Sequence, residues 1–214
     1  MRIAGKRLAY AAKSDGKWWA VVDEQKWGPY EELHGPSFSS DSKRVGYAAR
    51  RDGDRWRLVM DGEEGKQGYD EMRGPVFNPC GQRLAYAARV DGSWRMMVDG
   101  VEGPPYGDDI HDSVFSPDGK RVAYAGKRGK SWHVVVDGRE GRPYEDDIHD
   151  PIFSPDGKHM AYAVEQDEKW RPVLDGREGA LYDYMSPPVF SSDGKYVAYS
   201  ARKGGRWRII VERY

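Results

Sequence analysis

The aromatic residues of this chain recur at fixed intervals, and that repetition constrains the fold more than any other feature. Three aromatic columns repeat every 37 to 39 residues. The phenylalanines, five in all, form the first column: Phe38, Phe77, Phe115, Phe153 and Phe190. A tyrosine column is formed by Tyr10, Tyr47, Tyr86, Tyr124, Tyr162 and Tyr199, and a tryptophan column by Trp18, Trp56, Trp94, Trp132, Trp170 and Trp207. Such a period indicates a chain built from one repeated supersecondary unit.

Within each unit, large and small residues alternate with a period of two, as expected for strands, whose successive side chains point to opposite faces. In the unit that begins at Pro36, Val45 and Tyr47 share one face, whereas Gly46 and Ala48 share the other. Asp-Gly pairs and Ser-Pro-Asp-Gly segments separate the alternating stretches and favour tight hairpins. Each unit therefore predicts four antiparallel strands, A around Phe, B around Tyr, C around Trp and D at its end. Strand D is marked by Tyr30, Tyr69, Tyr106, Tyr144 and Tyr182.

Four-stranded units of about 40 residues, repeated around an axis, are typical of a β-propeller. The motif F-S-P-D-G-K, followed by A-Y, is unbroken at 115–120 and 153–158. It resembles the WD40-like repeat of TolB-type propellers, and the resemblance extends from Ile3 to Val211. The resemblance implies an all-β propeller and constrains function little, because one fold hosts many functions. We expect the tryptophan column to pack between blades.

We expect one domain, 1–214, with repeat units 1–35, 36–74, 75–112, 113–150, 151–187 and 188–214. The first unit begins at strand B and the last ends at strand C, so six four-stranded blades would be two strands short. One alternative is a propeller of five blades with two strands left over. Another is that the chain is a segment of a longer array. A further alternative is that the unpaired end strands pair between copies and produce a homo-oligomer, because free sheet edges recruit other strands.

Composition excludes several classes of function. The 34 basic and 35 acidic residues give a formal net charge of -1, which argues against a nucleic-acid partner held by bulk charge. No apolar stretch is long enough to cross a membrane, so we expect no membrane partner, and the first residues do not read as a signal peptide. The single cysteine, Cys80, forms no zinc motif, and no cofactor is predicted. The compartment stays open, since the resemblance allows a periplasmic or secreted protein.

One repeat position collects histidines near the predicted start of strand A, beside the channel of a propeller. Four residues before each Phe stand His34, Arg73, His111, His149 and Ser186. Imidazoles there are candidates for binding an anionic ligand or a divalent metal, and Arg73 for pairing with a carboxylate. The alternative is that they line a wet channel and bond to the backbone or to Asp112 and Asp150. We assign no catalytic residue and no metal site.

The connectors from strand D to strand A carry acids at two adjacent positions. The second position forms a candidate partner-binding rim, composed of Glu32, Glu71, Asp109 and Asp147. Because the acids recur in nearly every unit, they favour a structural or surface role over an asymmetric catalytic one. The sequence thus predicts a non-enzymatic scaffold that binds a protein or an extended ligand through the connector face. The alternatives are a small-ligand or metal-binding, carbohydrate-active propeller that uses the histidines, and a designed or excised array without an evolved site.

Overall fold

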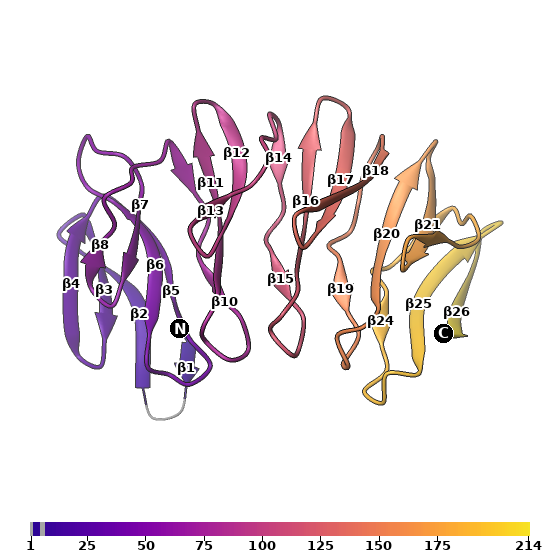
Figure 1. Cartoon of the computed structure of the whole chain (residues 1–214), viewed down its shortest axis with the longest axis horizontal. Helices are drawn as coiled ribbons and strands as arrows, with labels where there is room; N and C mark the ends of the chain where they lie inside the picture. Colours follow the sequence, from indigo (N-terminus) through magenta and orange to yellow (C-terminus); the bar gives the residue numbers. More distant parts are fainter. Residues whose placement is uncertain (1, 5–6) are drawn as a thin grey trace. The chain divides into compact units, whose positions relative to one another are not determined.

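The computed structural model describes residues 2–4 and 7–214, with side chains from residue 7 onward. It contains two compact units, Met1–Pro105 and Tyr106–Tyr214, and Figure 1 shows that each consists of antiparallel sheets. The described residues form no α-helix, and thus no helix able to cross a membrane. The prediction of an all-β chain is confirmed.

The first unit contains three sheets, which we call blades one to three. Blade one has the order β1-β2-β3-β4, with β1 Arg2–Ala4, β2 Arg7–Ser14, β3 Lys17–Val22 and β4 Gln25–Tyr30. Blade two has β5 Glu32–Phe38, β6 Val45–Arg50, β7 Arg57–Met60 and β8 Glu63–Glu64. Blade three has β9 Glu71–Met72 and β10 Val76–Phe77, which both pair with β11 Leu84–Val90, then β12 Ser93–Val98 and β13 Val101–Glu102.

The second unit contains blades four to six. Blade four has β14 Asp109–Ile110 and β15 Val114–Phe115 beside β16 Val122–Arg128, then β17 Ser131–Val136 and β18 Arg139–Tyr144. Blade five has β19 Ile152–Phe153, β20 Met160–Gln166, β21 Lys169–Leu174 and β22 Arg177–Glu178. Blade six has β23 Tyr184–Met185 and β24 Val189–Phe190 beside β25 Tyr196–Lys203, then β26 Arg206–Arg213.

The prediction that blade one lacks strand A is wrong. Residues 2–4 form β1 and pair with β2 through Arg2↔Ala9, Ile3↔Leu8 and Ala4↔Arg7. Three residues suffice, since strand A beside its turn is only two residues long in blades three and four. The expected absence of strand D from blade six holds in the described residues, where β26 pairs with β25 alone. Closure of six blades into one ring stays a prediction.

Aspartates at the C-to-D turns fix the start of strand B in five blades. Asp23, Asp61, Asp99, Asp137 and Asp175 all adopt a positive φ, close to 50°. Each accepts, through Oδ1, a hydrogen bond from the first or second residue of strand B; in blade four, Val122 N donates to Asp137 Oδ1 over 2.9 Å. Aspartate tolerates this left-handed conformation and supplies a local acceptor, which explains why it recurs there.

Large residues fill the space between consecutive blades of a unit. Trp132 of blade four packs with Ile148, Tyr162 and Val164 of blade five. Trp170 of blade five likewise packs with Met185 and Ala201 of blade six. Within each unit, the prediction that tryptophans pack between blades is confirmed for Trp56, Trp132 and Trp170. It is wrong for Trp207, which is 56% exposed.

Candidate functional site

The D-to-A connectors and the B-to-C hairpins lie at the same end of each blade. Hydrogen bonds join them: the first acid of a connector accepts one from a hairpin backbone N–H. Gly129 N donates to Asp108 Oδ2 over 2.7 Å, and Gly204 N donates to Asp183 Oδ2 over 2.7 Å. Asp70 and Asp146 are bonded in the same way. The first acid of these four connectors therefore holds the hairpin in place, which is a structural role, whereas Glu31 of the first connector lies 3.5 Å from Lys17.

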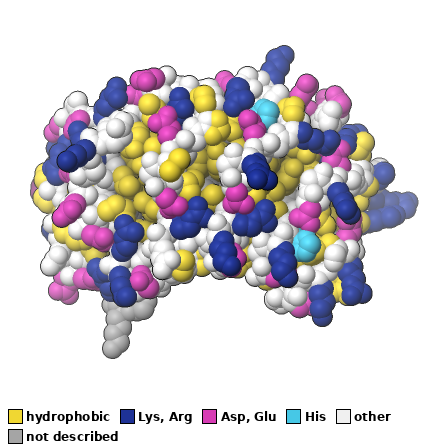
Figure 2. All heavy atoms as spheres, in the orientation of Figure 1, with side chains coloured by type: hydrophobic (Ala, Val, Ile, Leu, Met, Phe, Trp, Pro, Cys, Tyr) yellow, Lys and Arg dark blue, Asp and Glu magenta, His cyan; other side chains and the backbone are white. Residues whose placement is uncertain are grey.

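The second connector acids, which form the predicted rim, are more accessible. Glu32 and Glu71 are exposed and face arginines of their own blade, with Glu32 2.8 Å from Arg50 and Glu71 3.8 Å from Arg89. Asp147 is exposed and Asp109 half-buried, and each accepts a hydrogen bond from the backbone N–H of the following residue. Figure 2 shows acidic and basic side chains interspersed on the visible face. Surface ion pairs contribute little to stability, so Glu32 and Glu71 can exchange their arginines for a charged partner at little cost in stability.

The predicted channel residues lie on strand A or beside it. The three histidines and Arg73 each lie over the tryptophan ring of their own blade. The ring centroids of His34 and Trp56 lie 4.4 Å apart, and the Arg73 guanidinium carbon lies 4.9 Å from the Trp94 ring. His111 on Trp132 and His149 on Trp170 are each at 4.3 Å. The sequence analysis missed this stacking, although a constant separation of 21 or 22 residues between the partners could have revealed it.

In the second unit, Asp150 links two of these histidines. His111 Nδ1 lies 2.6 Å from Asp150 Oδ1, and Asp150 directly follows His149. His111 holds the pKa of the Asp150 carboxyl below its usual range, whereas burial lowers the pKa of His149. The Nδ1 atom of His149 is buried and has no hydrogen-bond partner among the described residues. This cluster of His111, His149 and Asp150 therefore combines one histidine–carboxylate pair with one unused imidazole nitrogen.

Ser186, the fifth residue of the column, departs from the histidine pattern. Its Oγ accepts a hydrogen bond from Ser200 N over 3.0 Å, so the hydroxyl is used within blade six. The structure brings His111 and His149 into one cluster in the second unit, and places His34 and Arg73 in the first. In the described part of the chain, no three His, Cys, Asp or Glu side chains are arranged to hold a metal ion.

Comparison with known proteins rests on structure. No protein-family model matches the sequence, and no curated protein is significantly similar to it. TolB from Acinetobacter baumannii superposes with a TM-score of 0.50 at 18% identity over 97% of this chain. This chain covers 61% of that TolB chain, less than two thirds of its length. The β-propeller domain of the trilobed protease from Pyrococcus furiosus, described as having an open velcro topology, gives a TM-score of 0.54 at 13% identity over 99% of this chain and 80% of its own.

The fold is that of a TolB-like β-propeller. Dihydro-heme d1 dehydrogenase NirN also matches, with a TM-score of 0.54 at 15% identity over 96% of this chain and 51% of its own. A TolB, a propeller domain of a protease and a dehydrogenase thus share this fold, and identities this low establish the fold alone. What this TolB-like propeller does must be argued from its own surface.

Proposed function

We propose that the protein is a non-enzymatic binding module that contacts a protein or an extended ligand through the connector end of its blades. The supporting observation is that the first and second acids of the connectors make different contacts. The first acid of a connector bonds to a hairpin backbone, as Asp108 does, whereas Glu32 and Glu71 point to solvent beside arginines. Side chains that the fold does not need, displayed at one repeated position, suit recognition of a partner with a patterned charge.

Charge reversal on the rim tests this proposal. The variant E32K/E71K changes two exposed acids of the first unit, and E24K/E63K makes the same formal charge change at the opposite end of its blades. We expect proteins captured from a lysate of the source organism by the wild type and by E24K/E63K to be lost with E32K/E71K, as quantified by mass spectrometry. Equal capture by both variants would contradict a role for the rim.

A second candidate function is supported by the unused Nδ1 of His149, whose sequence neighbour Asp150 pairs with His111. Under this proposal the cluster of His111, His149 and Asp150 binds a small polar ligand. Inorganic phosphate is a suitable probe, followed through the imidazole C–H resonances. We expect shifts confined to His111 and His149, with the His111 shift lost in H149Q, whereas His159, which pairs with Asp175, serves as the internal control. Equal shifts at His159 would indicate nonspecific binding and contradict this candidate.

A further inference from the structure

Blade six exposes one apolar sheet face. Trp207, Ile209 and Val211 of β26 are 56%, 72% and 60% exposed, and Tyr184 and Val189 are exposed beside them. Directly paired residues of antiparallel strands share a face, and the register pairs Val189↔Ala198↔Val211, Ser200↔Ile209 and Tyr184↔Arg202↔Trp207. The Tyr184 and Trp207 rings lie 5.6 Å apart. Together these five residues form the open face of blade six, a larger apolar surface than isolated exposed residues would give.

The same face is covered in blades that have a successor in their unit. Trp132 and Trp170 occupy the Trp207 position and are only 4% and 6% exposed. Trp170 is covered by Met185 and Ala201, which belong to the strand-A and strand-B side of blade six. A cation above the tryptophan ring does not prevent another blade from burying it, because Lys127 lies over buried Trp132 much as Arg202 lies over Trp207. The surface that fits the open face is therefore the strand-B side of another blade.

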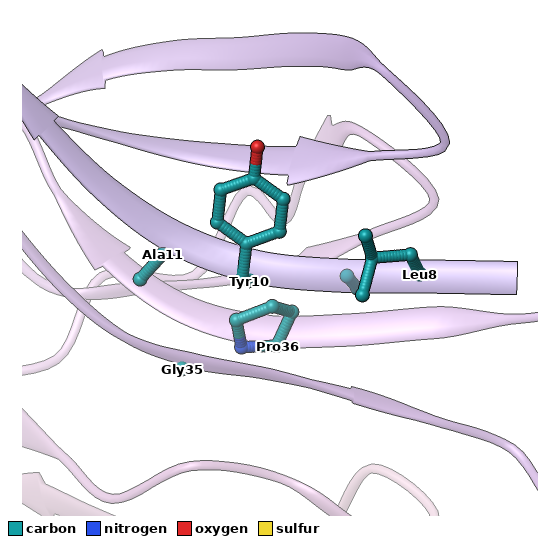
Figure 3. Close-up of a pocket in the computed structure, with 6 residues that line it drawn as sticks. Leu8, Tyr10, Ala11, Gly35 and Pro36 are labelled. Atoms are coloured by element: carbon teal, nitrogen blue, oxygen red, sulfur yellow. The ribbon is translucent and has the colours of Figure 1, made fainter. Parts of the chain in front are cut away.

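Blade one presents such a strand-B side uncovered. Tyr10 is 36% exposed, although Tyr47, Tyr162 and Tyr199, at the same repeat position, are at most 5% exposed. Figure 3 shows Tyr10 projecting from β2, which also carries Leu8; these residues line a surface hollow together with Gly35 and Pro36 of β5 in blade two. The blade-one face, Leu8 and Tyr10, thus has the residue types that a preceding blade covers elsewhere.

We propose that the open face of blade six binds the blade-one face of a second copy of this chain. The open face of blade six and the blade-one face correspond to the two sides of the contact that neighbouring blades make within each unit. Both faces are exposed, and each is complementary to the other face and not to itself. The association is therefore head-to-tail, and it forms closed rings of several copies or open chains according to its geometry.

The free edge of β26 is a less suitable contact than the face. Its eight residues include Arg206, Arg208 and Arg213, and charged residues on an edge strand oppose pairing with another edge. The apolar side chains of Trp207 and Ile209 project from the sheet face instead, where burial of their surface favours association.

Two variants and their mixture test this proposal. Ile209→Glu places a charge on the open face of blade six, and Tyr10→Glu places one on the blade-one face. Val101→Glu changes a side chain that is 71% exposed outside both faces and is the matched control. We expect the wild type and V101E to associate in a concentration-dependent manner in analytical ultracentrifugation. Each face variant alone should bind itself at least about 100-fold more weakly, because a buried carboxylate is strongly disfavoured.

The mixture distinguishes head-to-tail contact from other modes. I209E retains an intact blade-one face and Y10E an intact blade-six face, so we expect the two variants to form a one-to-one complex with wild-type affinity that grows no further. Circular dichroism of each variant checks that it is folded. A wild type that stays monomeric throughout the concentration range overturns the proposal. So does a Y10E variant that self-associates as the wild type does, since the blade-six face would then bind itself.

Discussion

Tyrosines of strand D and of the following strand B meet as buried pairs between blades. The hydroxyls of Tyr69 and Tyr86 lie 2.9 Å apart, with ring centroids 5.9 Å apart in a T-shaped arrangement. Burial raises the pKa of the Tyr86 hydroxyl, and similar burial raises the pKa of Tyr124 to about 12. These hydroxyls therefore stay protonated at neutral pH and act as neutral hydrogen-bonding groups.

Tyr86→Phe should lower the free energy of unfolding by about 1–3 kcal/mol, because it leaves the buried Tyr69 hydroxyl without its partner. The double variant Y69F/Y86F removes both polar groups and should lose less than the sum of the two single variants. Urea unfolding of all four proteins completes the double-mutant cycle. The exposed Tyr196→Phe is the control, expected to be nearly neutral. Additive losses in the cycle would show that the hydroxyls do not interact.

His149 should make stability depend on pH. Burial lowers its pKa below the usual value of about 6.5, with His111 acting in the same direction and Asp147 and Asp150 opposing. As the pH falls through this window, the unfolded chain takes up a proton that the folded chain does not, so the free energy of unfolding decreases. His149→Gln should reduce this dependence in urea unfolding between about pH 7.5 and pH 5.5. An unaltered slope in H149Q would contradict the argument.

At the scale of elements, the C-to-D turn has the same aspartate geometry in five blades. Asp137 has a φ of 51°, accepts a hydrogen bond from Val122 N and lies 3.1 Å from Arg121. Asp137→Ala should cost about 1–3 kcal/mol, because alanine disfavours that conformation and leaves Val122 N without its acceptor. Asp137→Asn keeps both the conformational tolerance and the Oδ1 acceptor, so it should cost less than about 1 kcal/mol. Equal losses in thermal unfolding would assign the effect to the carboxylate charge instead.

The turns and strands were predictable because their determinants are local. Ser154 Oγ donates to Asp156 Oδ1 over 2.6 Å and accepts from His159 N, which explains the S-P-D-G motif. Where Cys80 replaces the turn aspartate, Asn78 compensates by accepting from Gln82 N and Arg83 N. The sequence pattern did not anticipate this compensation, because it depends on a different residue of the same turn.

Other features of the fold and of the candidate site depend on contacts between distant residues and were missed. A three-residue strand such as β1 carries too little alternation to be recognised, and becomes a strand only by pairing with β2. The stacking of His111 on Trp132 joins strands A and C across strand B, and the contact of His111 with Asp150 joins two blades. Trp170 and Trp207 both follow a basic residue and precede an arginine, yet only Trp170 is buried, so the local sequence does not determine their burial.

At the scale of the molecule, each unit holds its own hydrophobic clusters. In the second unit one cluster joins blades four and five, around Trp132 and Tyr162, and another joins blades five and six, around Trp170 and Tyr199. Repeat proteins derive stability from each repeat and from the interfaces between neighbours. A unit that retains complete blades and the interfaces between them therefore retains most of its own stability.

Residues 106–214 should accordingly fold alone. This fragment keeps every strand of blades four to six and both clusters that join them. A control fragment, 127–214, starts near the end of β16 and so loses most of the central strand against which β14, β15 and β17 pair. We expect a near-UV circular dichroism signal and cooperative urea unfolding from the first fragment, with a smaller transition from the second because only blades five and six stay complete. A non-cooperative 106–214 fragment would mean that its three blades require residues outside the unit, and that the interfaces between neighbouring blades are too weak to sustain it.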